Sequence, residues 1–499
     1  MSQKQQEHKT YVMKFGGSSL AGPKEIIQSA SIIKKYSTDS NLVIVCSAMG
    51  DTTDHLLKAV EHAKKGETNH ARKVISEVHQ SHMTAINEGV TDQRCRDVCR
   101  DWLAELFDEI DKVLLGISLL RDLSPRSLDY ILSFGERLAT YIVSNALVSM
   151  GLKTKYLSGG EAGIMTDESF GSAEPILKIT NEKLRGTLVP LIADGVIPVV
   201  TGYIAETLES HEIITLGRGG SDYTATLIAA AIDADEIVLW TDVDGILSAD
   251  PRLIKNARIL EQVTYLEAME MSAFGAKSMQ PRSLEPVARK GIPVRIRNTF
   301  NPSGAGTLIL AASKISNGAR SGSGVKAVGS ITNVGAITIS GTSIVGSPGT
   351  AAKIFEILEN LGVPILMMSQ SVSENNVSLV VKREYMHKVV KTFKKELLLE
   401  DPDSIVRANP DSRTTKFNFL DYEDDVTIVA VLGRGMIGTP GIAGRVFSTV
   451  AKQGINIRMI AQGSSEINIS FVIKDKDRSK AVAALHEEFV LKETHSVGV

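Results

Sequence analysis

The sequence predicts an α/β protein: a large layered α/β domain followed by two copies of a smaller α/β module. Three observations lead to this prediction. From residue 11 to about 312, short β-branched runs alternate with longer helical patterns, as in layered α/β domains. Residues 311–324 are rich in Ser and Gly and predict a linker. Beyond it, residues 347–381 align without a gap on residues 439–473, and 13 of the 35 pairs are identical.

Four apolar runs in the first part predict strands of its sheet. Several are apolar nearly throughout, as expected for a sheet that helices cover on both faces. Residues 54–150 mix charged and apolar residues at helical spacing, which predicts helices. The four strands are expected at residues 41–48, 196–204, 236–242 and 292–298.

Each copy of the repeat reads as strand, Pro-Gly turn, helix, strand, tight turn and strand, with a further helix after it. In the first copy, Ala351, Ile354, Phe355 and Leu358 form one apolar stripe, which predicts a core-facing helix face. The duplication therefore predicts paired α/β modules. The sequence leaves open whether they fold as successive blocks or exchange strands.

The composition is that of a soluble globular protein of two to four domains. A net charge of −3 provides no basic field, so nucleic acid is not an expected partner. The polar N-terminus has no signal segment, and no apolar run approaches the ~20 residues that span a bilayer. Three cysteines fit a reducing cytosol, which predicts a cytoplasmic location. Cys95 and Cys99 lack a nearby second pair, so we expect no metal site there.

The first stretch that could carry chemistry is KFGGSS, residues 14–19. A Walker A loop has its lysine after the glycines, whereas Lys14 here precedes Gly16 and Gly17. Glycines where a strand turns into a helix let backbone N–H groups approach a phosphate. Taken alone, the stretch fits equally well a phosphate-binding turn or a plain turn with a solvated lysine.

A second glycine turn, TLGRGGSD, covers residues 215–222. Ser221 or Asp222 could be the N-cap of the Ala-rich helix that follows. A single cap requires neither three glycines nor Arg218, whose planar fork suits a carboxylate or phosphate. The combination favours an anion site.

Three further segments have weaker signals. The acidic loop WTDVDGILSADPR, residues 240–252, follows a predicted strand; it lacks EF-hand spacing, so nucleotide contacts are favoured over direct metal ligation. Lys277 could simply be a solubilising lysine. Glu136 and Arg137 could simply form a surface ion pair.

Together these segments resemble the aspartate kinases (aspartokinases) of the amino-acid kinase family, in their monofunctional form. The resemblance covers nearly the whole chain, and the tandem copies resemble ACT domains. It implies an amino-acid-kinase-type three-layer α/β/α sandwich followed by two ferredoxin-like ACT domains. The matching stretches are KFGGSS, VIVCSAMGDTTD (43–54), SFGERLAT (133–140), TLGRGGSDYTA (215–225), WTDVDGILSADPR and FGAKSMQPRSLEPV (274–287). The implied boundaries are 1–312 for the kinase domain, 313–325 for the linker, and 326–424 and 425–499 for the ACT domains.

The resemblance implies transfer of the ATP γ-phosphate to the β-carboxylate of L-aspartate, giving 4-phospho-L-aspartate for lysine, methionine and threonine biosynthesis. An ionised carboxylate needs no general base, so the site must supply positioning and charge neutralisation. Mg²⁺ would be held mainly by the ATP phosphates, with no metal ligands assigned to the chain.

The resemblance also implies roles for individual residues. The implied catalytic residues are Lys14, Asp222 and Lys277. The implied substrate contacts are Ser47, Thr53, Glu136, Arg218 and Ser221. The implied ATP contacts are Lys14, Gly16, Gly17, Ser18, Gly219, Gly220, Thr241, Asp242, Arg252 and Lys277. Arg218 would pair with the α-carboxylate of aspartate, and Glu136 would receive its ammonium group. Two positions depart from the family pattern: Leu247 replaces a tyrosine near the adenosine, and Gln280 replaces a histidine.

In the ACT pair, the resemblance implies an amino-acid effector bound by Ile344, Ser347, Gly349, Gln370 and Gln462. Lysine-responsive relatives often have an acidic residue where this chain has Leu366 and Arg458, so threonine is favoured over lysine as the inhibitor. In the alternative, the two glutamines only satisfy buried backbone groups. ACT pairing between chains would give a homodimer or tetramer.

Two other functions compete with a regulated kinase. One is a non-catalytic amino-acid sensor with a decayed kinase domain, which the joint presence of Lys14, Arg218 and Asp222 disfavours. The other is a fused kinase and homoserine dehydrogenase, which would need several hundred further residues; we do not expect it.

Overall fold

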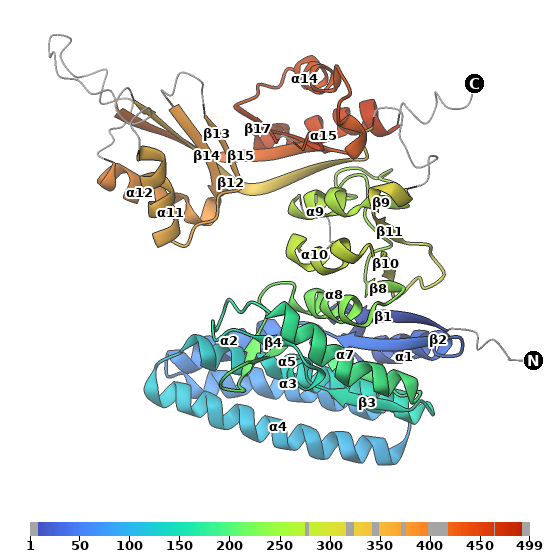
Figure 1. The fold of residues 1–499 in the computed structure, drawn as a ribbon. Helices are drawn as coiled ribbons and strands as arrows, with labels where there is room; N and C mark the ends of the chain where they lie inside the picture. Colours follow the sequence, from blue (N-terminus) through green and yellow to red (C-terminus); the bar gives the residue numbers. More distant parts are fainter. Residues whose placement is uncertain are drawn as a thin grey trace, which may run out of the picture. The chain divides into compact units, whose positions relative to one another are not determined.

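The computed structural model describes residues 8–274, 279–315, 324–341, 349–370, 376–397, 418–463 and 465–491 (Figure 1). The chain forms two compact units. The first comprises Met1–Ile246, Ile259–Ser272 and Lys277–Ser316, and the second comprises Leu247–Arg258, Ala273–Ala276 and Asn317–Val499. Lys277, for which a catalytic and ATP-binding role is predicted, and most of the predicted linker lie outside the described residues. None of the described helices is long and apolar enough to cross a membrane.

The main sheet of the first unit has the strand order β3-β5-β2-β1-β8-β10-β11-β9. All neighbours are parallel except β10 and β11. The strands are β1 (Lys9–Phe15), β2 (Ser40–Cys46), β3 (Thr154–Leu157), β5 (Ile197–Thr201), β8 (Glu236–Thr241), β9 (Gln262–Thr264), β10 (Val294–Asn298) and β11 (Thr307–Leu310). The four predicted strands are confirmed, but β2, β5 and β8 end before the predicted boundaries. Ile204, predicted in the same strand as β5, instead begins β6 (Ile204–Thr207).

Helices cover both faces of this sheet. Side chains from β1, β2 and β8 form one core with α1 to α5, while α7 and α8 pack on strands from the other face. The helices are α1 (Pro23–Tyr36), α2 (Thr52–Lys64), α3 (Thr68–Gly89), α4 (Gln93–Leu120), α5 (Pro125–Ser149), α7 (Leu177–Ala193), α8 (Gly220–Ile232), α9 (Tyr265–Ala273) and α10 (Pro281–Lys290). The three-layer sandwich and the helical segment 54–150 are therefore confirmed.

Smaller elements complete the first unit. A second, three-stranded sheet has the strand order β4-β6-β7. The elements are η1 (Gly17–Leu20), α6 (Gly159–Ala162), β4 (Met165–Thr166), β6 (Ile204–Thr207), β7 (Ile213–Thr215) and η2 (Ala312–Lys314).

The second unit is built on an antiparallel sheet in the order β13-β14-β12-β15-β17-β16. Its strands are β12 (Ala327–Gly341), β13 (Met367–Gln370), β14 (Asn376–Lys382), β15 (Asn418–Leu432), β16 (Met459–Gln462) and β17 (Asn468–Lys474). Its helices are α11 (Thr350–Asn360), α12 (Arg383–Glu396), α14 (Ile442–Lys452) and α15 (Arg478–His486). The two copies of the repeat have the same order of elements, as predicted.

The two modules exchange strands. Residues 334–340 of β12 pair with β14, whereas residues 327–331 pair with residues 428–432 of β15. The 426–432 half of β15 in turn pairs with β17, and its 418–423 half returns to β12. Each long strand therefore belongs to both modules. The predicted boundary between residues 424 and 425 falls inside β15 and stays a prediction.

The predicted apolar stripe of α11 is wrong at two positions. Ile354, Ile357 and Leu358 are buried, but Phe355 is 45% exposed and Ala351 is exposed. The helix lies on one sheet face, so only the positions at the i, i+3, i+4 spacing beginning at Ile354 reach the core.

Candidate active site

The carboxyl ends of three adjacent strands meet at one edge of the main sheet. Gly16, just after β1, donates its N–H to the Trp240 carbonyl of β8 (3.1 Å), and Ser47, just after β2, donates to the Phe15 carbonyl (3.0 Å). Gly50 donates to the Gly17 carbonyl (3.1 Å). These backbone bonds hold the KFGGSS turn against the turn after β2. Open α/β sheets bind ligands at this edge, and the predicted residues converge here.

Lys14 and Asp222 form the central ion pair of this edge. Lys14 Nζ lies 2.7 Å from Asp222 Oδ1, and the two side chains are 15% and 20% exposed. Asp222 lies in the first turn of α8, whose N-cap is Gly219. The alternative in which Ser221 or Asp222 caps this helix is therefore wrong. Asp222 instead orients the lysine side chain.

The second glycine turn presents Arg218 beside the start of α8. Gly217 and Gly219 both have left-handed backbones (φ 71° and 76°), which only glycine adopts without strain. Arg218 is exposed. The N–H groups at the start of α8 have no carbonyl acceptors within the helix, because no helical turn precedes them. A Cβ on Gly219 would lie 2.6 Å from Cγ of Gln280, so Gln280 packs against the turn. The arginine and the helix start together form an anion-binding arrangement.

Glu136 is buried, at 4% exposed, in the middle of α5. Its Oε1 accepts the N–H of Ala48 (3.1 Å), while Oε2 has no hydrogen-bond partner among the described residues. Burial raises the pKa of Glu136 to about 8, although the charge of Lys14 opposes this rise. The interpretation of Glu136 and Arg137 as a surface ion pair is wrong, because Arg137 pairs with Glu109 (3.4 Å) instead. The free oxygen is suited to receiving a cationic group.

The predicted Ser47 and Thr53 lie close to this carboxyl group. Ser47 is half-buried at the end of β2, next to Ala48, and Thr53 is half-buried in the first turn of α2. A Cβ on Gly135 would lie 2.8 Å from the Ala48 side chain and 3.7 Å from Thr53 Oγ1. Gly135 thus allows α5 to approach these residues closely enough for Glu136 to reach the Ala48 N–H.

The predicted nucleotide residues are only partly brought together. Gly16, Gly17, Ser18, Gly220, Thr241 and Asp242 lie on the turns at the strand ends of the first unit. Thr241 Oγ1 donates to Asp242 Oδ1 (3.1 Å). Arg252 belongs to the second unit, is 88% exposed and pairs with Asp250 at 2.8 Å.

Two residues of the site were missed by the sequence analysis. Tyr203 has a left-handed backbone (φ 66°), costly for a bulky residue, and a Cβ on Gly220 would lie 2.7 Å from its ring. Burial raises its pKa to about 12. Asp129 of α5 accepts Thr215 Oγ1 (2.7 Å) and the Gly171 N–H (2.9 Å). Gly202 and Tyr203 lay inside the predicted strand 196–204, where a glycine next to an aromatic residue was a usable signal of a turn, whereas nothing local marked Asp129.

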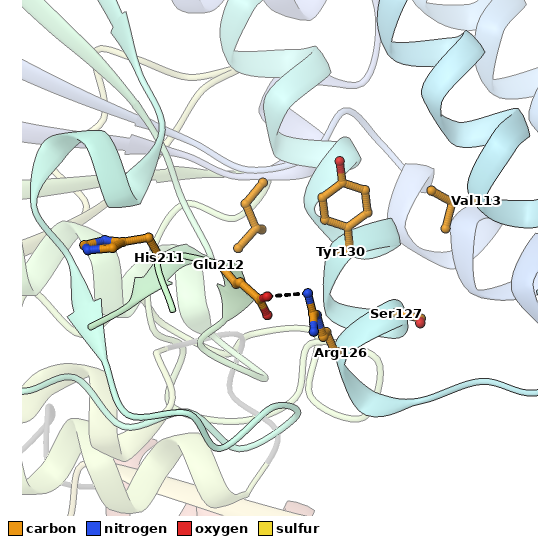
Figure 2. Close-up of a pocket in the computed structure, with 7 residues that line it drawn as sticks. Val113, Arg126, Ser127, Tyr130, His211 and Glu212 are labelled. Carbon is orange, nitrogen blue, oxygen red and sulfur yellow. Dashed lines mark ion pairs between the residues drawn. The ribbon is translucent and has the colours of Figure 1, made fainter. Parts of the chain in front are cut away.

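A cavity of about 490 Å³ lies elsewhere in the first unit (Figure 2). It is formed by the start of α5 and the turn between β6 and β7, with an ion pair between Arg126 and Glu212 across it. Arg126 precedes Glu136 by ten residues of α5, or about 15 Å. This cavity is therefore separate from the strand-end site.

The described effector residues of the ACT pair are solvent-accessible. Gln370 and Gln462 are exposed at the ends of the edge strands β13 and β16. Exposure excludes the alternative in which they satisfy buried backbone groups. Gly349 is exposed, with φ 111°, directly before α11. Ile344 and Ser347 lie outside the described residues.

Comparison with known proteins identifies the family of the chain. Residues 9–298 match the amino acid kinase family, and residues 337–397 and 429–489 match an ACT domain. Aspartokinase 1, chloroplastic, of Arabidopsis thaliana is 32% identical over 490 residues, covering 96% of this chain and 80% of the relative. A bifunctional aspartokinase/homoserine dehydrogenase of Zea mays is 33% identical over 98% of this chain, which spans 51% of that relative.

Solved structures give the same result. E. coli aspartokinase III, in complex with aspartate and ADP in its R-state, has a TM-score of 0.77 and 25% identity, covering 97% of this chain and 100% of that one. The aspartate kinase of Clostridium acetobutylicum has a TM-score of 0.74 and 29% identity, covering 96% and 100%.

The fold is that of an amino acid kinase, and the chain belongs to the amino acid kinase family. Within that family it is an aspartokinase with C-terminal ACT domains, and therefore an ATP-dependent kinase.

Proposed function

We propose that the chain transfers the γ-phosphate of ATP to the β-carboxylate of L-aspartate, giving 4-phospho-L-aspartate. The observation that carries the proposal is the arrangement of Lys14, Asp222 and Glu136 at one sheet edge. A lysine held by an aspartate can face a moving phosphoryl group, and a buried carboxyl oxygen without a partner can receive a substrate ammonium. The E. coli relative was solved with aspartate and ADP, which supports this choice of substrates.

The site contains receptors for both charges of an α-amino acid. Glu136 Oε2 would accept the ammonium group, and Arg218 would pair with the α-carboxylate. Ser47, Thr53 and Ser221 would orient the substrate between them. The remaining β-carboxylate would then face Lys14. It is ionised at neutral pH and attacks without a general base.

Nucleotide binding would use the same edge. The glycine turns with Gly16, Gly17, Gly219 and Gly220, and the hydroxyl group of Ser18, would lie against the phosphates, and Thr241 and Asp242 would contact the nucleotide. Arg252 and Lys277 stay predicted contacts. Among the described residues, no group of three or more His, Cys, Asp or Glu side chains could hold a metal ion. Mg²⁺ would be carried mainly by the ATP phosphates.

The product would enter lysine, methionine and threonine biosynthesis, and the ACT pair would bind an amino-acid inhibitor. Threonine is favoured because Leu366 and Arg458 offer no acidic partner for a lysine side chain. The E. coli relative was solved with lysine, so lysine is the direct competitor. A homodimer or tetramer and a cytoplasmic location remain part of the proposal; the three free, buried cysteines fit a reducing compartment.

The test is ATP-dependent formation of an acyl phosphate, trapped with hydroxylamine as a hydroxamate. We expect product with aspartate and little with glutamate. Activity on glutamate alone would assign the chain to a sister kinase. Effector binding without hydroxamate from any amino acid would favour the non-catalytic sensor.

A further inference from the structure

A buried hydrogen bond inside the second unit links a kinase motif to the second ACT domain. Ser248 belongs to the WTDVDGILSADPR motif, and His486 ends α15. Ser248 Oγ lies 2.8 Å from His486 Nε2, and the two residues are 0% and 1% exposed. Ser248 Oγ also accepts the Arg258 N–H (2.9 Å). The sequence analysis assigned a role to neither Ser248 nor His486.

The protonation state of His486 fits this bond. Burial, reinforced by the charge of Arg258, lowers the pKa of His486. A neutral ring can accept the Ser248 hydroxyl proton at Nε2, while the hydroxyl oxygen accepts the Arg258 N–H. Removing Ser248 then leaves Nε2 of His486 without a donor in a buried place, and removing His486 leaves the Ser248 hydroxyl proton without an acceptor.

The rest of the segment 247–258 is part of the ACT core. The Ser248 N–H donates to the Arg258 carbonyl (2.8 Å), and the Ser248 carbonyl accepts the N–H of Val328 (2.8 Å). Ala249 and Ile254 are buried in one cluster with Phe471 of β17 and with side chains of α14 and α15. Half of a kinase motif is therefore folded into the regulatory unit.

The other half of the motif is anchored in the first unit. Ile246 donates its N–H to Thr307 Oγ1 (2.8 Å), and its carbonyl accepts the Leu260 N–H (2.8 Å). A Cβ on Gly245 would lie 2.5 Å from Thr307 Oγ1, so this turn tolerates little displacement. Only Leu247 separates the anchored Ile246 from the anchored Ser248. Such a short connection transmits a shift of one anchor to the other.

We propose that Ser248 and His486 are positioning residues for nucleotide binding: their hydrogen bond lets the second ACT domain set the conformation of the turn Thr241–Ile246. The inference rests on the proposed role of Thr241 and Asp242 as nucleotide contacts. It predicts that loss of the bond weakens nucleotide binding selectively, because aspartate is held by residues on other elements.

The test compares full-length Ser248→Ala, His486→Leu and the double variant. Four quantities are measured: KM for ATP, KM for aspartate, Kd for a fluorescent ADP analogue, and Tm. We expect KM for ATP and Kd for the analogue to rise about fivefold, with KM for aspartate changed less than about twofold. Because both residues act through one bond, the double variant should match the single ones. His486→Gln, which keeps an acceptor, should recover part of the affinity.

Thr427→Val is the matched control. Thr427 is also fully buried in the second ACT domain, and its hydroxyl donates to Asp475 rather than to the segment 247–258. It should lower Tm without changing nucleotide affinity. If Ser248→Ala and His486→Leu behave like this control, or if their effects on Kd add, the proposal is wrong. The ADP analogue needs no aspartate, so a chain inactive on aspartate would reject the proposed function while still deciding this inference.

Discussion

Lys14 at the end of β1 and Asp222 in the first turn of α8 form an ion pair of 2.7 Å. The two residues are separated by most of the first unit in sequence, and both side chains are largely shielded from water. The ion pair thus links the strand that leads into the first glycine turn to the helix that follows the second glycine turn. It thereby fixes the direction of the lysine ammonium before any ligand binds.

Lys14→Ala should lower kcat by about 10²- to 10³-fold, as for removal of one transition-state donor. Asp222→Asn should lower kcat less, since the lysine remains but loses its partner. Hydroxamate formation at saturating substrates measures both. Lys290→Ala, which breaks the more exposed ion pair with Asp233, is the control and should keep normal kcat. Normal activity in Lys14→Ala would remove this residue from the chemistry.

Glu136 predicts the pH dependence of aspartate binding. Its pKa stands at about 8 in the free protein, and the ammonium of aspartate needs the ionised form. Therefore kcat/KM for aspartate should rise with pH through about 8 and level off above it, whereas Glu136→Gln should bind poorly at every pH. Glu105→Gln, on the surface of α4, should keep the wild-type profile. A profile that is the same with and without Glu136 would exclude this assignment.

The same group predicts a pH dependence of stability. A carboxyl whose pKa is raised from 4.5 to about 8 on folding is destabilising when ionised. The protonated form contributes fully to the free energy of unfolding below pH 4.5, and this contribution is lost as the pH rises from 4.5 through about 8. Between pH 5 and pH 9, Glu136→Gln should lose less unfolding free energy than the wild type. Denaturant unfolding at the two pH values measures the difference, and an equal loss in both proteins would contradict the prediction.

Arg218→Ala should mainly raise KM for aspartate, by about 10- to 100-fold, because it removes a charge-assisted hydrogen bond. The control is Arg126→Ala, which breaks the ion pair with Glu212 at the separate cavity. It should leave KM for aspartate unchanged. Steady-state kinetics with varied aspartate distinguishes the two arginines, and an unchanged KM in Arg218→Ala would place this arginine outside the substrate site.

Gly135→Ala tests the packing that positions Glu136. The new methyl group would lie 2.8 Å from Ala48 Cβ, so α5 must shift, at a cost of about 1–3 kcal/mol in unfolding free energy. KM for aspartate should rise with it. Gly116→Ala in α4 meets no atom within 4 Å and should be neutral or stabilising, by up to about 1 kcal/mol. If Gly135→Ala and Gly116→Ala change the unfolding free energy and KM for aspartate equally, the close approach of Gly135 to Ala48 does not position Glu136.

Gln370→Ala should weaken feedback inhibition while leaving uninhibited kcat nearly intact, because the side chain is exposed at the end of β13. Inhibition curves with threonine, with lysine and with both identify the effector. Thr392→Ala on the exposed side of α12 is a control that should retain normal inhibition. Inhibition by lysine alone would reject threonine as the effector.

The sequence by itself determined the layered α/β domain, the repeat and the residue types of the site. These follow from local signals: apolar strands alternating with helical periods, glycine turns after strands, and a gapless internal alignment. They also marked Lys14 beside the first glycine turn and Arg218 and Asp222 in the second as candidate site residues.

Only the tertiary structure decided the relationships between distant segments. It paired Lys14 with Asp222, buried Glu136 with one free oxygen, and rotated the buried face of α11 away from Phe355. It also exchanged the strands β12 and β15 between the modules and divided one kinase motif at Leu247. Such contacts depend on how elements pack and which groups lose water, and a linear pattern contains neither.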